Sequence, residues 1–274
     1  MSPSLDQIVA AARRKVSKDR STAWTREVER DANARVPRGF RRSLEAASRK
    51  GAAVIAELKK ASPSRGLIRS DFNPEGLARE LEGAGAAALS VLTDEEFFQG
   101  SLENLRRASA SVKLPCLRKD FFVDEFQIVE ARASGADAIL LIVAALSQAE
   151  LANLLKSAGQ WGLDVLCEVH DEEELSRAVD AGCDLIGVNS RDLRTFKVDL
   201  ETAFRLGELV PRNAVRVAES GIQNGADIAR LRAAGYQAFL IGEWLMKAES
   251  PGIALRKLIA EAERRELAPS NPEN

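Results

Sequence analysis

The sequence lacks the features of several protein classes. It has no uncharged apolar run of about 18 residues, so it predicts no membrane span, and residues 1–14 contain no apolar stretch of signal-peptide length. Its formal net charge of -2 gives no electrostatic reason to expect nucleic acid as a partner. It contains 1 histidine and 3 cysteines without the spacing of a metal site, so we expect no bound metal ion.

The cysteines also argue against a disulfide framework. Cys116, Cys167 and Cys183 are odd in number, and each lies in or beside an apolar run. Buried, reduced thiols are the default for such positions in a reducing cytoplasm. We therefore predict three free cysteines and a cytoplasmic protein.

What the sequence does contain is a regular alternation of two kinds of segment from residue 51 onward. Strand-like apolar runs occur at 54–58, 87–92, 114–118, 138–143, 164–169, 185–188, 215–219 and 238–241. Helical patterns occur at 74–82, 102–111, 125–134, 148–160, 172–181, 200–209, 225–234 and 252–264. Continuous apolar strands that alternate with helices are typical of a parallel sheet buried on both faces.

Eight strand–helix units predict an α/β fold, a closed (β/α)8 TIM barrel over residues 50–268. Glycines near residues 85, 135, 182 and 235 end a helix before a strand, as a weak internal repeat. A doubly wound open sheet is the alternative, but no glycine-rich dinucleotide fingerprint follows the first strand. Residues 1–49 predict an N-terminal extension of one or two amphipathic helices, and residues 269–274 a disordered tail.

Charged side chains stand at the end of the first predicted strand. Ile55, Glu57 and Lys59 are two residues apart and should line one face of it. A charged pair at the carboxyl end of a buried strand is costly unless its members are paired or solvated, which is a first sign of a site. The alternative is a plain ion pair at the rim of the sheet.

Polar groups also follow the other strands, and in a barrel the carboxyl ends of the strands surround the active site. The candidates are Ser62, Lys119, Glu168, His170, Asn189, Arg191 and Glu219. Lysines beside carboxylates push pKa values apart, so one pocket can hold an acid and a base. We predict proton transfer on a phosphorylated small molecule, with a structural ion-pair network as the alternative. For His170, a supporting or loop role is favoured over an acid/base role.

Two turns near the end of the chain have the features of a phosphate site. Ser220 and Gly221 follow the seventh strand, and Gly242 and Glu243 follow the eighth. In many barrels these turns present backbone N–H groups to a phosphate, which glycine allows to approach closely. The alternative is that the glycines only form tight turns.

Seven stretches, in order along the whole predicted barrel, resemble those of the indole-3-glycerol-phosphate synthases. They are ELKKASPS (57–64), SVLTDEEFFQGS (90–101), LRKDF (117–121), CEVH (167–170), GVNSRDL (187–193), AESGI (218–222) and LIGE (240–243). That family also carries a helical extension before its barrel, which suits residues 1–49.

The resemblance implies that 1-(2-carboxyphenylamino)-1-deoxyribulose 5-phosphate closes to indole-3-glycerol phosphate in tryptophan biosynthesis, with loss of carbon dioxide and water. It implies that Lys119 is the general acid for the ketone oxygen, and that Glu168 stabilises the cationic intermediate or acts in dehydration. Lys59 and Glu57 resemble the pair that manages the departing hydroxyl. The substrate-binding positions fall on Asn189, Arg191, Glu219 and Ser62, and the phosphate-side positions on Ser220, Gly221, Gly242 and Glu243.

The resemblance implies no cofactor, because the substrate's own ring is the electron sink. A desolvated lysine with a lowered pKa would supply the acid. Phe98, Phe122 and Leu140 are candidates for an apolar wall against the substrate's ring, although each also fits the core. Two residues depart from the family pattern: Ser190 stands where a second Asn or a similar residue is usual, and Trp244 where a small residue is usual.

Two other functions fit the same barrel. A catalytically idle barrel would only bind a phosphorylated ligand or a partner protein. Another phosphosugar enzyme, such as a ketose-forming isomerase, would not need Lys59, Lys119 and Glu168 together. The expected partner is a small-molecule phosphorylated substrate, and a monomer is favoured over a dimer.

Overall fold

A computed structural model describes residues 3–23, 26–192, 195 and 197–267 of the chain. Eight parallel strands close into a barrel in the order β1-β10-β9-β8-β7-β6-β5-β4. They are β1 (Ala53–Leu58), β4 (Ala88–Leu92), β5 (Cys116–Lys119), β6 (Ala138–Ile142), β7 (Asp164–Val169), β8 (Leu185–Asn189), β9 (Val215–Glu219) and β10 (Ala238–Ile241). The predicted closed barrel is confirmed, and the open sheet was the wrong alternative.

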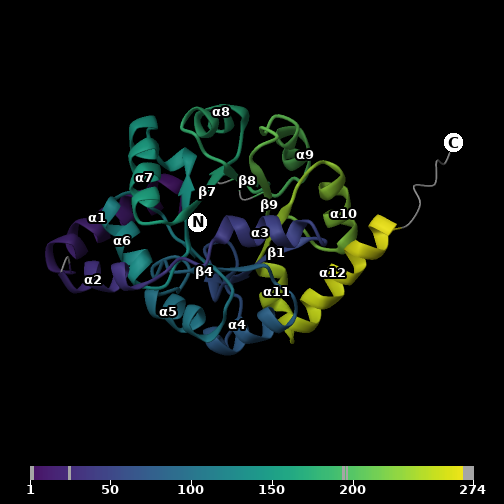
Figure 1. The fold of residues 1–274 in the computed structure, drawn as a ribbon, viewed down its shortest axis with the longest axis horizontal. Coiled ribbons are helices and arrows are strands. Elements are labelled where there is room, and N and C mark those ends of the chain that lie inside the picture. Colours follow the sequence, from purple (N-terminus) through teal and green to yellow (C-terminus); the bar gives the residue numbers. More distant parts are fainter. Residues whose placement is uncertain (1–2, 24–25, 193–194, 196, 268–274) are drawn as a thin grey trace.

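Helices ring the strands (Figure 1). They are α4 (Pro74–Gly83), α5 (Leu102–Ser111), α6 (Glu125–Ala133), α7 (Gln148–Gln160), α8 (Glu172–Asp180), α9 (Glu201–Gly207), α10 (Gly225–Ala233) and α12 (Pro251–Leu267). Each of the predicted helical segments corresponds to one of these. The four predicted stop glycines have φ angles of +97°, +93°, +85° and +91°, in the left-handed region that ends a helix.

The strands divide their side chains between two apolar layers. In β1, Val54, Ala56 and Leu58 pack in the layer between barrel and helices. Ala53 and Ile55 pack in a second cluster, inside the barrel. This alternation follows from the two-residue period of a strand, and it places Glu57 on the same face as Ile55, as predicted.

Three helices precede the barrel, where one or two were predicted: α1 (Leu5–Ala23), α2 (Arg26–Ala34) and α3 (Phe40–Ser48). Phe40 and Leu44 of α3 are fully buried in the inner cluster, so α3 closes the end of the barrel where the strands begin. Burial of each side chain contributes about 1.5–3 kcal/mol. Just before α3, Arg38 binds Asp137 at 2.7 Å, which ties the extension to the start of β6.

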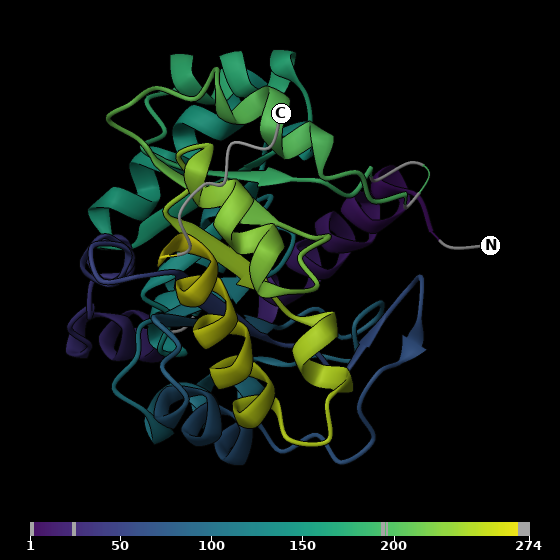
Figure 2. The ribbon, with the colours of Figure 1, turned by 90° about the vertical axis from the view of Figure 1, so that its right-hand side faces the viewer.

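Short elements lie at the opposite end of the barrel. A small hairpin of β2 (Ala61–Ser62) and β3 (Gly66–Leu67) follows β1, and α11 (Glu243–Lys247) follows β10. A single 3-10 turn, η1 (Val143–Ala145), follows β6. In Figure 2 the hairpin and the start of α1 project from the same side of the barrel, where the strands end. The sequence did not predict these short elements.

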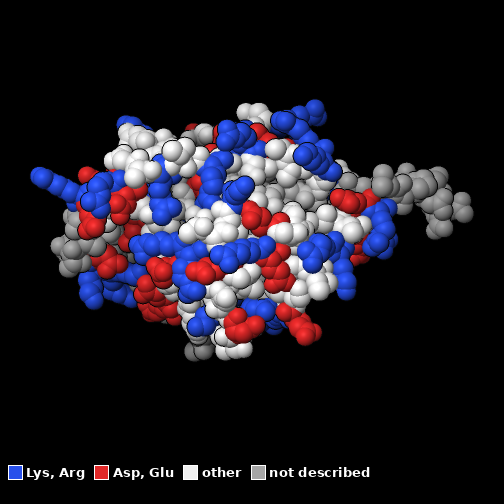
Figure 3. Space-filling view, turned by 60° about the horizontal axis from the view of Figure 1, so that its bottom comes forward, with Lys and Arg blue, Asp and Glu red and all other residues white. Residues whose placement is uncertain are grey.

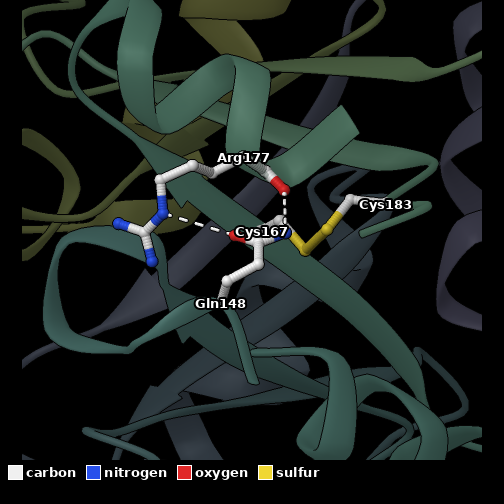
Figure 4. The surroundings of a disulfide bond; sticks show 4 residues. All are labelled: Gln148, Cys167, Arg177 and Cys183. Atoms are coloured by element: carbon white, nitrogen blue, oxygen red, sulfur yellow. Dashed lines mark hydrogen bonds between the residues drawn. A yellow bond between two sulfur atoms is a disulfide. The ribbon is translucent and has the colours of Figure 1, made fainter. Parts of the chain in front are cut away.

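One prediction about the cysteines was wrong. Cys167 of β7 and Cys183, two residues before β8, form a disulfide beside Gln148 and Arg177 (Figure 4). Cys167 points out of the barrel into the layer beneath the helices, where Cys183 also packs. Adjacent strands bring the two side chains together, although 16 residues separate them in sequence. Cys116 is buried and free, as predicted.

The surface mixes charges of both signs. On the face drawn in Figure 3, Lys and Arg side chains lie among Asp and Glu, without a large area of one sign. None of the helices in the described part of the chain is long and apolar enough to cross a membrane. The predicted tail, 269–274, lies outside the described residues.

Candidate active site

A cavity of about 480 Å³ opens where the barrel strands end. All twelve residues predicted for catalysis, substrate binding or phosphate binding line it: Glu57, Lys59, Ser62, Lys119, Glu168, Asn189, Arg191, Glu219, Ser220, Gly221, Gly242 and Glu243. They come from strands far apart in the sequence. The closed barrel brings them together because the carboxyl ends of parallel strands meet at one rim.

Lys119, the last residue of β5, lies between two carboxylates at the floor of the cavity. Its Nζ donates to Glu168 Oε2 at 2.7 Å and to Glu219 Oε2 at 2.9 Å. Both glutamates are almost completely buried. A buried ammonium flanked by buried carboxylates forms a compact charged centre, because unpaired charges at this depth would be strongly destabilising.

The electrostatics of this centre correct one prediction. Burial lowers the pKa of Lys119, but the charges of Glu168, Glu219 and Glu57 outweigh it, so the pKa is raised and the side chain stays an ammonium. The predicted desolvated lysine with a lowered pKa is therefore wrong. Burial also raises the pKa of Glu168, but Lys119 and His170 hold it well below its ordinary value.

Glu219 behaves differently from its neighbour. Burial and the negative charge of Glu168 raise its pKa to about 7, although Lys119 acts in the opposite direction. Its Oε1 is buried and has no hydrogen-bond partner in the described structure. The cavity floor thus holds a firmly ionised carboxylate beside one that can exchange a proton near neutral pH.

A second charged pair lies at the end of β1, where Lys59 Nζ is 2.6 Å from Glu57 Oε1. The predicted ion pair is present, and it faces the cavity. Glu57 packs directly against Gly242, where any Cβ would overlap Glu57 Oε1 and come within 2.9 Å of Glu57 Cβ. A Cβ at Gly187 of β8 would likewise overlap Glu219 Oε1. Both glycines provide the space in which a carboxylate sits.

Among the described residues, three cations lie near Glu243 at the predicted phosphate side. Lys247 Nζ lies 2.6 Å, Arg65 Nε 3.1 Å and Arg191 Nη2 3.7 Å from its carboxylate oxygens. Burial raises the pKa of Glu243, but Lys247, Arg65 and Lys59 hold it below its ordinary value. The same end of the cavity contains Ser220, whose φ of +64° is uncommon for a residue other than glycine. Such conformations cluster at ligand-binding turns.

An apolar wall lines another part of the cavity, and one predicted member of it was wrong. Phe98 and Leu140 line the cavity as predicted, and Phe121 joins them. The ring centroids of Phe98 and Phe121 are 6.3 Å apart. Phe122 is buried outside the cavity lining, with the Arg118 guanidinium 5.1 Å from its ring centroid.

The N-terminal extension also reaches the cavity. Pro3, Leu5 and Ile8, at or near the start of α1, belong to its lining. Sequence analysis did not include them, because nothing local in residues 1–49 indicates which face of the helix would meet a pocket formed by distant parts of the chain.

Ser190 and Trp244, the two residues that depart from the family pattern, both lie close to the cavity. Ser190 is buried, and its backbone N–H donates to the Glu219 carbonyl at 2.9 Å. Its hydroxyl has no hydrogen-bond partner in the described structure. Trp244 lines the cavity from α11 and also packs against the outer apolar layer. The indole therefore borders the predicted phosphate side of the cavity rather than lying only beneath it.

His170 is outside the cavity lining but contacts Glu168, 3.3 Å from Nε2 to Oε1. Within the described residues, no group of three or more His, Cys, Asp or Glu side chains is arranged to hold a metal ion. The chemistry available at the cavity is that of ammonium, guanidinium and carboxylate groups around an apolar wall.

These features define a (β/α)8 barrel with a cavity at the carboxyl ends of its strands, lined by ammonium, guanidinium and carboxylate groups beside an apolar wall. The family model described as indole-3-glycerol phosphate synthase matches residues 5–258. A protein of Koribacter versatilis (strain Ellin345) named indole-3-glycerol phosphate synthase is 61% identical over 259 residues, covering 94% of this chain and 100% of that protein. The chain belongs to the indole-3-glycerol phosphate synthase family.

Solved structures with other names share only the fold. Thiamine phosphate pyrophosphorylase from Pyrococcus furiosus is 19% identical with a TM-score of 0.59, covering 79% of this chain and 98% of that one. A mandelate oxidase variant is 16% identical with a TM-score of 0.62, covering 86% and 92%. At these identities the likeness supports the barrel architecture and no shared reaction.

Proposed function

We propose that this chain is a carbon–carbon lyase that closes 1-(2-carboxyphenylamino)-1-deoxyribulose 5-phosphate to indole-3-glycerol phosphate, releasing carbon dioxide and water in tryptophan biosynthesis. Membership of the family supports this reaction. The single observation that carries it is the Lys119 ammonium held between Glu168 and Glu219 at the floor of a cavity with an apolar wall.

In the first step, the ring carbon that bears the carboxylate attacks the ketone carbon, and the ketone oxygen gains negative charge. Lys119 donates its proton to that oxygen as the charge develops. Its raised pKa suits this role, because the ammonium is fully protonated beforehand and an alkoxide is more basic than an amine. Carbon dioxide then leaves, and its bonding electrons restore the aromatic ring.

In the second step, the new hydroxyl leaves as water. It needs one added proton, and the neighbouring carbon must lose one. Lys59 and Glu57, 2.6 Å apart, are the proposed pair for this exchange. Glu168, whose pKa is held low, stabilises the positive charge on the nitrogen while the hydroxyl departs.

The phosphate is proposed to bind at the turns after β9 and β10. Ser220 and Gly221 offer backbone N–H groups there, and Gly242 does so at the start of α11. Because Glu243 is negatively charged, it contributes its backbone rather than its carboxylate, while Lys247 and Arg65 beside it supply positive charge. Arg191 is proposed for the substrate's carboxylate, which a planar guanidinium binds well. Asn189 and Ser62 complete the substrate contacts.

The test is turnover of the carboxyphenylamino-deoxyribulose phosphate, followed by indole fluorescence. We expect product from the natural chain and none from Lys119→Met with its fold intact. Lys156→Met, on the exposed face of α7, is the matched control and should retain full activity. No product from the natural chain, or near-normal turnover in folded Lys119→Met, would overturn the proposal.

A cytoplasmic location is part of the proposal, because a phosphate ester does not cross a bilayer and must be consumed where it is made. The Cys167–Cys183 disulfide speaks against it, since disulfides are rare in a reducing cytoplasm. Cell fractionation with antibody detection tests the location, and recovery outside the cytoplasmic fraction would refute it.

A further inference from the structure

His170, the only histidine of the chain, follows β7 two residues after Glu168 and directly precedes the N-cap of α8, Asp171. Its side chain is 12% exposed and lies outside the cavity lining. Ring nitrogen Nδ1 lies 2.9 Å from Glu174 Oε2, and the same oxygen accepts the backbone N–H of His170 at 2.8 Å. Glu174 therefore fixes both the ring and the backbone of His170.

The other ring nitrogen faces the reaction centre. Nε2 is buried and lies 3.3 Å from Glu168 Oε1, within ion-pair distance but without a hydrogen bond to any group in the described structure. The opposite oxygen of that carboxylate, Oε2, accepts from Lys119. A carboxylate with a cation at each oxygen has little freedom to rotate.

We propose that His170 is a positioning residue for Glu168, holding Oε1 of that carboxylate as a charged imidazolium anchored by Glu174 while Lys119 occupies Oε2. The imidazolium touches neither cavity nor substrate, so it acts only through Glu168. The inference deepens the proposed function and rests on it for its kinetic effect, although the contact itself can be tested without turnover.

The charges around His170 agree with this role. Glu168 of β7 and Glu174 of α8 face its two ring nitrogens, Lys119 of β5 lies beyond Glu168, and Glu219 of β9 lies beyond Lys119. Burial lowers the pKa of His170, but Glu168 and Glu174 outweigh it and raise the pKa to about 10. Both ring nitrogens then carry protons at neutral pH, and the two carboxylates balance the charge of the imidazolium.

Because the chain has one histidine, the contact can be measured without resonance assignment. NMR titration of the untagged protein, labelled with ¹⁵N-histidine, should give one imidazole that stays protonated through neutral pH. Glu168→Gln and Glu174→Gln should each lower its pKa by at least about one unit, as loss of a contacting opposite charge does. Glu173→Gln is the matched control, because Glu173 is one residue away in the same turn of α8 and does not contact His170. It should leave the pKa of His170 unchanged.

Two variants separate positioning of Glu168 from simple capping of α8. In His170→Asn, the amide nitrogen lies where Nδ1 was and can bind Glu174. In His170→Gln, the amide nitrogen lies where Nε2 was and can bind Glu168. If His170 positions Glu168, the kcat of His170→Asn should fall about tenfold while its KM changes little. A tenfold loss has the same free energy as a shift of about one unit in the pKa of Glu168. His170→Gln should lose clearly less.

The outcomes are distinct from those of the proposed function. An inactive natural chain would refute the function, while the NMR titration would still report on the contact. Titration of His170 near its ordinary pKa of 6.5, or a pKa unmoved in Glu168→Gln, would overturn the inference. A higher kcat in His170→Asn than in His170→Gln would also overturn it, because that result is expected if His170 only holds Glu174 at the start of α8.

Discussion

The ammonium of Lys119 lies 2.9 Å from Glu219 Oε2, yet the other oxygen of that carboxylate is buried without a hydrogen-bond partner in the described structure. Burial and the negative charge of Glu168 raise the pKa of Glu219 to about 7, whereas Lys119 and His170 hold the pKa of Glu168 low. Because Glu219 titrates near neutral pH, both the free energy of unfolding and the turnover of the protein should depend on pH there.

The first prediction concerns Glu219→Gln. The folded-state pKa of Glu219 is raised from 4.5 to about 7, so its contribution to stability is fully present below pH 4.5 and is lost as the pH rises through 7. Gln copies the protonated form and cannot lose a proton. The variant should therefore gain stability relative to the natural chain between pH 5 and 8, by up to about 3 kcal/mol.

Urea denaturation at both pH values measures this difference. Glu208→Gln, at an exposed position after α9, is the control and should show no such trend. A stability difference between Glu219→Gln and the natural chain that is constant with pH would contradict a titrating Glu219.

The second prediction uses two adjacent phenylalanines. Phe121 lines the cavity, whereas Phe122 is buried beneath Arg118 in the outer layer. Phe121→Ala should raise KM about tenfold, equivalent to about 1.4 kcal/mol of lost binding. Phe122→Ala should instead lower the free energy of unfolding by about 3–5 kcal/mol. Steady-state kinetics and denaturation on both variants check the pair, and an exchanged pattern would refute the assignment.

This pair also illustrates what the sequence could and could not predict. The alternation that places Glu57 and Lys59 on one face of β1 was enough to direct both into the cavity. The same alternation counted on from Lys119 points to Phe121, so the signal for the correct aromatic residue was present and was not used. Strand bounds such as Asp164–Val169 and Val215–Glu219 were also predicted, because buried parallel strands form continuous apolar runs.

Other features left no local signal. The two-residue strands β2 and β3 and the five-residue helix α11 are too short to produce a hydrophobic period. The contribution of Ile8 to the cavity and the pairing of Cys167 with Cys183 depend on contacts between distant segments. The raised pKa of Lys119 needs three carboxylates placed around it, which only the closed barrel does.

The third prediction concerns Gly242→Ala, which adds a single methyl group beside Glu57. A Cβ there would overlap Glu57 Oε1, so Gly242→Ala should push Glu57 away from Lys59. A displacement of about 1 Å at a catalytic pair can cost about 100-fold, and we expect at least about a tenfold loss in kcat. Gly159→Ala in α7 is the matched control, because a Cβ at Gly159 meets nothing within 4 Å. Full activity in Gly242→Ala would show that the position of Glu57 does not matter for turnover.

The last prediction concerns the disulfide between Cys167, which directly precedes Glu168, and Cys183. Cys167 and Cys183 close a loop with a sequence separation of 16 residues, for which a cross-link contributes about 3 kcal/mol through the unfolded chain. Reduction should lower the melting temperature of the natural chain by roughly 6–12 °C, at about 2–4 °C for each kcal/mol. It should leave Cys183→Ser unchanged, because that variant has no bond to break. Thiol titration of the unfolded, unreduced protein should find one free cysteine, Cys116, and three free thiols would mean that the bond does not form.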